Sequence, residues 1–295
     1  MSEKKSHQPS MTLEEQVKNL ESLGLIINDK EWAKSILNDI SYFRLIKAFS
    51  LRLKAKNDKY EEGTTFEQIV DLYLFNAKFR QLLFPEIEKV EINLRCRMAN
   101  YFSDRYGVLG YKDAENFRDQ KYYNMFINDI VMEVKRNSKA PFVKNFCGNY
   151  EGGNLPFYAL VEILSFGTIS KVFKNMQNSD KNNIAKTFGT GYTYFESWIE
   201  SLSYVRNLCA HYGRLYNAKF SKTPKLYPNY RVAGITSNRL FGTLICLRYL
   251  LSKDKHWSIF VEELATLFDE YKVVDKTTMG FPEDWKEVLL GNMAK

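Results

Sequence analysis

The sequence predicts an all-α protein, and three observations lead to this fold class. Apolar residues recur at intervals of three and four along most of the chain, which is the spacing of one face of an α-helix. No segment alternates apolar and polar residues over the length of a β-strand. Helix-starting and helix-ending residues divide the chain into segments of ordinary helix length. We therefore expect one helical domain over residues 11–290, behind a flexible polar tail at residues 1–10.

In the N-terminal half, three sequence signals indicate where helices begin. Thr12 and Glu15 form a capping-box pattern, in which each side chain can accept a hydrogen bond from the other residue's backbone. Thr65 is a further N-cap, and Pro85 is expected to start a separate helix, because proline is favoured in a first helical turn. The expected helices cover residues 11–25, 29–40, 41–54, 65–83, 85–106 and 116–135.

The C-terminal half is also expected to be helical, with a glycine-rich loop over residues 148–154. Pro156 opens a helix, and the Ser-Phe-Gly-Thr stretch at 165–168 interrupts the apolar pattern. The expected helices cover residues 157–164, 169–176, 194–212, 239–251, 259–271 and 282–290.

Composition excludes several classes of protein. The first ten residues hold no apolar run and no segment of about 18 apolar residues follows, so we expect neither a signal peptide nor a membrane span, and a cytoplasmic location. The cysteines are far apart, which favours reduced thiols, and no His/Cys cluster has the spacing of zinc ligands. The cysteines are Cys96, Cys147, Cys209 and Cys246. We expect no metal ion and no cofactor. The net charge of +7 suits a polyanionic partner, although solubility alone explains it equally well.

One histidine stands out as a candidate for acid–base chemistry near neutral pH. His7 lies in the polar tail and His256 follows a Lys-Asp-Lys run, whereas His211 shares a predicted helix with Arg206 and Asn207. At about 100° per residue, Asn207 and His211 fall on the polar side of this helix. Arg206 projects close to the apolar side, about 140° from His211.

A guanidinium near an apolar face needs an anionic partner. Arg206 therefore either pairs within the chain, with Glu91 or Glu162, or reaches a cleft where a substrate phosphate binds. Glu91 and Arg95 are four residues apart in a predicted helix and can form an ion pair. For Glu91, Arg95 and Glu162, structural ion pairing is the simpler interpretation.

Cationic and aromatic residues alternate in residues 214–231, directly after the histidine. Such a segment could bind RNA, with cations on phosphates and aromatic rings stacked on unpaired bases. The simpler alternative is a solvated connector anchored by its aromatic side chains. The candidate RNA contacts in and beside the segment are Tyr212, Arg214, Asn217, Lys219 and Lys222.

Cleavage of RNA is the chemistry that suits one histidine and one arginine without a metal ion. RNA carries its own nucleophile, the 2′-hydroxyl, so the protein needs only to move protons and to stabilise a charged phosphorane. The expected products are a 2′,3′-cyclic phosphate and a 5′-hydroxyl, and DNA should resist cleavage. The sequence shows no glycine-rich phosphate loop, no nucleophile elbow and no acidic metal cluster.

The segment from Arg206 to Asn217 resembles the signature of the abortive-infection Abi-like proteins, a branch of the HEPN superfamily defined by an arginine and a histidine with four to six residues between them. Further blocks in family order extend the resemblance over roughly residues 12 to 220, with the motif core at about 64–220. These blocks are Ile40-Ser-Tyr-Phe-Arg-Leu, Asp71-Leu-Tyr-Leu-Phe-Asn with Arg80-Gln-Leu-Leu, Ile87-Glu-Lys-Val-Glu-Ile-Asn-Leu-Arg95 and Glu162-Ile-Leu-Ser-Phe-Gly-Thr-Ile-Ser170.

The resemblance implies a HEPN-like helical bundle with additional N- and C-terminal helices. It implies a homodimer whose two Arg/His motifs share a cleft, metal-independent endoribonuclease activity, and a role in phage defence or as a toxin restrained by an RNA or protein antitoxin. Arg206 would bind the phosphate, Asn207 would orient the reacting groups, and His211 would be the general acid and base.

Two features bear on this function. Some members of the superfamily bind RNA or act as scaffolds without cutting, so a catalytically silent protein is the alternative. In toxins that nucleotidyltransferase antitoxins modify, a tyrosine stands two residues after the histidine, whereas this chain has Gly213 there and Tyr212 beside it.

Overall fold

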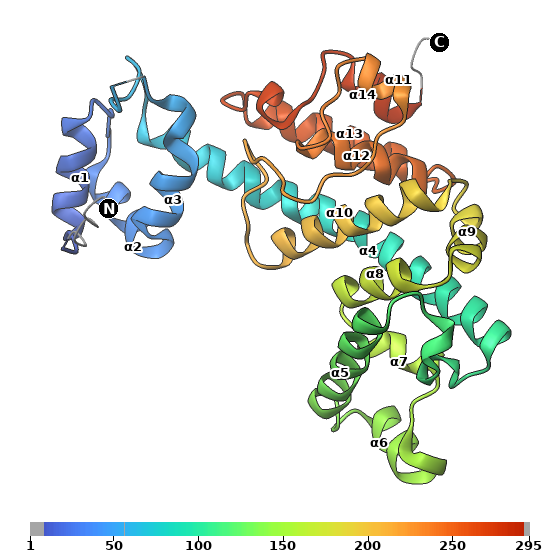
Figure 1. Cartoon of the computed structure of the whole chain (residues 1–295). Coiled ribbons are helices and arrows are strands. Elements are labelled where there is room, and N and C mark those ends of the chain that lie inside the picture. Colours follow the sequence, from blue (N-terminus) through green and yellow to red (C-terminus); the bar gives the residue numbers. More distant parts are fainter. Residues whose placement is uncertain (1–8, 56, 292–295) are drawn as a thin grey trace, which may run out of the picture. The chain divides into compact units, whose positions relative to one another are not determined.

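The computed structural model describes residues 9–55 and 57–291, and it confirms the all-α class (Figure 1). Within these residues there are fourteen α-helices and no β-strand; extended segments meet only in three isolated bridges. The predicted tail at 1–10 lies almost wholly outside the described residues, as does His7.

The contacts within the chain divide it into two compact units. One unit runs to Phe79 and includes Thr266–Asp275; the other holds Arg80–Ala265 and the residues from Lys276 onward. Two of the three boundaries, after Phe79 and before Thr266, fall inside helices, so no linker composition marks them in the sequence. Compact units of this kind do not decide the number of domains, so the single domain over residues 11–290 stays a prediction.

In the first unit, local capping sets the helix starts. Thr12 accepts a hydrogen bond from the backbone of Glu15, and the Glu15 carboxylate accepts one from Thr12 N–H at 2.7 Å, which confirms the capping box. Thr65 and Gln68 make the same reciprocal pair at the next long helix. The helices of this unit are α1 (Leu13–Ser22), α2 (Lys30–Ile40), α3 (Tyr42–Phe49) and the first part of α4 (Phe66–Tyr106).

The expected break at Pro85 is wrong, because α4 is one helix of 41 residues with Pro85 inside it. A proline in a helix interior costs about 3 kcal/mol through a lost hydrogen bond and a steric clash. Around Pro85 the apolar stripe continues without a change of phase, and each large apolar side chain buried in it contributes roughly 1.5–3 kcal/mol. The fully buried members of this stripe are Leu83, Ile87, Val90, Leu94 and Met98.

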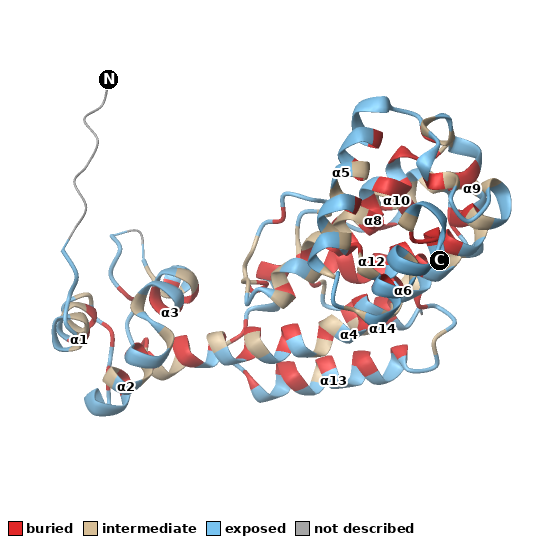
Figure 2. Cartoon of the chain, turned by 90° about the horizontal axis from the view of Figure 1, so that it is seen from below, coloured by how far each residue is buried: buried red, intermediate tan, exposed pale blue. Residues whose placement is uncertain are grey.

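The second unit is built around α10 (Tyr192–Ala210), which packs against α8, α9 and α12. Its other helices are the rest of α4, α5 (Gln120–Arg136), α6 (Pro141–Asn149), α7 (Phe157–Ile163), α8 (Phe166–Asn175), α9 (Asn178–Thr187), α11 (Pro228–Val232), α12 (Leu240–Leu250), the first part of α13 (Trp257–Glu270) and α14 (Trp285–Leu290). The predicted apolar side of α10 is confirmed as core, and its buried residues appear red in Figure 2. They include Phe195, Trp198, Ile199, Leu202, Val205 and Cys209.

Three helices of this unit, α6, α9 and α11, were not expected from the sequence. The polarity of α9 explains why the sequence pattern did not predict it, since its first six residues are Asn-Ser-Asp-Lys-Asn-Asn. It is held by buried Asp180, whose carboxylate accepts hydrogen bonds from Tyr101 and Tyr106 and pairs with Arg105. Among the described helices none is by itself long and apolar enough to cross a membrane; residues 151–163 and 166–175 reach that length only as a pair bent by 112°.

Candidate functional site

The motif that contains Arg206 and His211 lies at the C-terminal end of α10. The helix ends at Ala210, two residues before the expected end, and His211 is its C-cap. Tyr212 then takes the left-handed conformation, with φ of 58°, and Gly213 N–H donates to the Leu208 carbonyl oxygen at 2.6 Å. This bond is the mark of a Schellman termination, which usually places glycine where Tyr212 stands.

Gly213 is required here by a close approach of the backbone. A Cβ atom at this position would lie 2.8 Å from Leu208 Cδ2 and 3.0 Å from Leu208 Cα. Gly213→Ala is therefore expected to lower the free energy of unfolding by about 1–3 kcal/mol, as overpacking does. Urea denaturation measures this, with Gly148→Ala as the control, because a Cβ there meets nothing within 4 Å. Equal stability of the two variants would contradict the tight turn.

Arg206 is held against α4 by an ion pair. Its side chain is 33% exposed, its Nε lies 3.4 Å from Glu91 Oε2, and its guanidinium lies 5.4 Å from the centre of the Phe84 ring. The Nε atom is buried and makes this ionic contact in place of a hydrogen bond. Of the two partners considered from the sequence, Glu91 is the one that pairs; Glu162 is exposed on α7.

Glu91 bridges two arginines. It also pairs with Arg95, as their spacing predicts, and Arg95 donates to the Val161 carbonyl oxygen. The Glu91 and Arg95 side chains are only 9% and 11% exposed. A buried carboxylate between two guanidinium groups restricts the orientation of both, because each arginine must keep its charge neutralised.

His211 and Asn207 form the exposed part of the motif. Both residues are exposed, and His211 N–H donates to the Asn207 carbonyl oxygen at 3.0 Å, one helical turn away. Arg206 faces α4, whereas His211 is exposed just beyond the last residue of α10. Cys209 between them is no nucleophile at neutral pH, because burial raises the pKa of its thiol to about 12.

The candidate RNA contacts after the motif differ in how accessible they are. Tyr212 is 69% exposed, with the Arg80 guanidinium 6.0 Å from its ring centre. Lys219 is exposed, whereas burial lowers the pKa of half-buried Arg214. Asn217 accepts a hydrogen bond from Arg239 at 3.5 Å. Lys222 is exposed but pairs with Glu200 at 2.6 Å.

The aromatic residues of the 214–231 segment are not displayed for base stacking. Tyr216, Phe220 and Tyr230 are 3%, 4% and 2% exposed. Tyr227 packs its ring against Tyr194 and Tyr249. The stacking expectation is thus wrong for these rings, since their faces are used in the core. The rings anchor the segment, as the alternative expects, and RNA binding by the cations of the segment stays a prediction.

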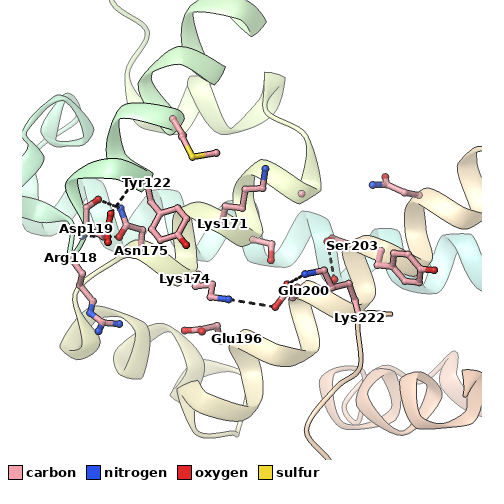
Figure 3. A pocket seen from close by; sticks show the side chains of 15 residues that line it. Arg118, Asp119, Tyr122, Lys171, Lys174, Asn175, Glu196, Glu200, Ser203 and Lys222 are labelled. Carbon is pink, nitrogen blue, oxygen red and sulfur yellow. Dashed lines mark hydrogen bonds and ion pairs between the residues drawn. The ribbon is translucent and has the colours of Figure 1, made fainter. Parts of the chain in front are cut away.

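A pocket of about 570 Å³ lies beside the motif, between the start of α5, α8 and α10 (Figure 3). Asn207 is the motif residue that lines it. In Figure 3, Lys171 and Lys174 of α8 lie between Tyr122 of α5 and Glu200 of α10. The sequence did not reveal this pocket, because its walls come from α5 and α10, which are about 80 residues apart in the chain. They come together only when both helices pack on α8.

No cluster of three or more His, Cys, Asp or Glu side chains that could hold a metal ion is found in the described part of the chain. A family model described as Abi-like protein matches residues 35–217. The chain belongs to the Abi-like family. The span that matches this Abi-like family contains Glu91, Arg95, Arg206 and His211. No curated protein and no solved structure matches the chain.

Proposed function

We propose that this Abi-like protein is a metal-independent endoribonuclease of the HEPN superfamily. The observation that carries the proposal is the end of α10, where exposed His211 follows Arg206, which is held by a buried carboxylate. This is a chemically sufficient pair for cutting RNA, and it lies inside the matched family span.

Proton transfer is the role proposed for His211. As a neutral imidazole it accepts the proton of the 2′-hydroxyl, whose oxygen attacks the adjacent phosphorus; as an imidazolium it donates a proton to the departing 5′-oxygen. The P–O5′ bond breaks as the P–O2′ bond forms, which leaves a 2′,3′-cyclic phosphate and a 5′-hydroxyl. Arg206 stabilises the charge on the phosphorane, and Asn207 orients the reacting groups.

A homodimer would complete the site. Within one chain Arg206 faces α4 while His211 lies at the exposed end of α10. Two copies that meet along this end of the helix would place the motif of one beside the motif of the other, so that a phosphate could contact both side-chain types. The RNA would also contact Tyr212, Arg214, Asn217, Lys219 and Lys222 around this cleft.

Abi-like membership supports a biological role in abortive infection. We propose that the protein acts in the cytoplasm, in phage defence or as the toxin of a toxin–antitoxin pair. An RNA or protein antitoxin would restrain it in the absence of infection.

A catalytically silent RNA-binding or scaffold protein is the second candidate. The ion pair with Glu91 favours it, because a guanidinium that already has a partner can serve structure alone. Incubation of purified protein with RNA separates the two candidates. If the folded protein binds RNA with a strong dependence on salt concentration but never cleaves it, the catalytically silent protein is favoured.

Removal of divalent ions is expected to leave the cleavage rate unchanged. The proposed reaction uses the substrate's own hydroxyl and two side chains, so no step requires a metal. The measurement compares initial rates of RNA cleavage with and without excess EDTA at constant ionic strength. A rate that falls to background with EDTA and returns with Mg²⁺ would remove the proposed mechanism.

A further inference from the structure

The pocket between α5, α8 and α10 has three carboxylates in its lining, and each already has a partner. Asp119 caps α5 by accepting from the backbone N–H groups of Lys121 and Tyr122 at 2.9 and 3.1 Å. Glu196 pairs with Lys181 at 2.8 Å. Glu200 pairs with Lys222 at 2.6 Å and with Lys174 at 3.7 Å. Glu196 and Glu200 are therefore neutralised by lysines, whereas Asp119 keeps its charge and is held by the backbone of α5.

Two cations of the lining lack such partners. Arg118 and Lys171 are exposed, and in the part of the chain that the structure describes neither side chain makes a hydrogen bond or an ion pair. The lining and the lysine paired with Glu196 together hold five cations against three carboxylates, which leaves the pocket a local positive excess; the cations are Arg118, Lys171, Lys174, Lys181 and Lys222. Charge of this kind attracts a phosphate group, which each cation can contact directly.

An exposed aromatic ring stands between the cations. Tyr122 is 55% exposed and Met125, one turn further along α5, is 46% exposed. Exposed apolar side chains are ordinary when scattered singly. Here Tyr122 and Met125 line one pocket together with the two cations. An exposed aromatic ring beside cations is the arrangement on which an RNA base stacks while its phosphate is bound.

We propose that this pocket binds a nucleotide unit of single-stranded RNA, with phosphates on Arg118 and Lys171 and a base on Tyr122. The volume of about 570 Å³ lies within the range of pockets that hold small organic ligands, so it accommodates a nucleotide. Asn207 lines the same pocket and is one turn from His211, so a strand held here leads to the end of α10. This proposal rests on the proposed function. It adds the route that the RNA strand takes along the protein, from this pocket to His211.

Binding is tested on the His211→Ala protein, which under the proposed mechanism is expected to bind RNA without cutting it. Fluorescence anisotropy with a labelled oligouridylate of roughly 12 nucleotides, within known single-strand site sizes, gives affinity at several salt concentrations. Arg118→Ala and Lys171→Ala should each reduce the slope of log affinity against log salt by about 0.7, the loss of one phosphate contact. Tyr122→Ala should weaken binding roughly tenfold, whereas Tyr122→Phe should retain it.

Matched controls lie outside the pocket. Lys186→Ala removes one exposed cation from α9, and Tyr158→Ala removes a 50% exposed ring from α7; neither should change affinity by more than about twofold. Pocket variants that bind like these controls would overturn the proposal. The proposal would also be overturned if uridine monophosphate bound as tightly as the oligomer, since the ligand would then be a free nucleotide.

This test does not depend on catalysis. If the pocket variants lose affinity while the wild-type protein cuts no RNA, the binding site stands and the nuclease proposal fails. If the wild-type protein cuts RNA while the pocket variants bind normally, the nuclease proposal stands and the pocket is not the RNA path.

Discussion

Replacing His211 by alanine is expected to lower the rate of RNA cleavage by a factor of roughly 10²–10⁴, the range that a positioned acid–base group contributes. The loss arises because the motif contains no second histidine that could take over the proton transfer. His211 is exposed at the end of α10, so its removal should leave the fold intact. The measurement is the single-turnover cleavage rate of a labelled RNA.

His256→Ala is the matched control, since it removes an exposed imidazole outside the motif and should cut RNA at the wild-type rate. Arg206→Ala should be as inactive as His211→Ala, because the phosphorane then lacks its cation. Cleavage that persists at the wild-type rate in both motif variants would remove the proposed site. Far-ultraviolet circular dichroism confirms that each variant is folded.

Replacing Glu91 by alanine is expected to lower the free energy of unfolding by about 3 kcal/mol or more. The substitution leaves Arg95, which is 11% exposed, and the partly buried Arg206 without their shared carboxylate. Unpaired buried charge is among the few changes that cause losses of this size. Urea denaturation of the purified protein measures the difference.

Glu162→Ala provides the comparison, because this glutamate is exposed and the change should stay within about 0.5 kcal/mol of wild type. Glu91→Gln adds a test of function: it keeps the shape of the side chain but removes the charge that holds Arg206. We expect it to slow cleavage by loosening the arginine. A Glu91→Ala protein as stable as Glu162→Ala would show that the two-arginine bridge contributes nothing.

Local signals allowed the fold class and many helix starts to be predicted. The Thr12–Glu15 capping box and the apolar side of α10 depend on residues a few positions apart, so the sequence contains all the information needed. The break at Pro85 failed for the opposite reason. The intrinsic preference of proline is outweighed by a stripe of side chains that the tertiary fold buries on both sides of it.

The residues of the candidate site also fall into two groups, those that local sequence signals predict and those that only tertiary packing brings together. The Arg206–His211 motif and the Glu91–Arg95 pair were found because each lies within one helix or its cap. From the sequence, the partner of Arg206 could be narrowed to Glu91 or Glu162. The structure shows that it is Glu91, on α4. Arg118, Tyr122 and Lys171 were missed, because their relation to Asn207 exists only after α5, α8 and α10 have packed.

The chemical nature of the RNA ends tests the central claim most directly. Mass spectrometry of the products that the purified protein forms in EDTA should find a 2′,3′-cyclic phosphate on one fragment and a 5′-hydroxyl on the other, because the 2′-oxygen is the proposed nucleophile. A 3′-hydroxyl together with a 5′-phosphate would mean that water attacks the phosphorus, and would contradict cleavage by Arg206 and His211 as described.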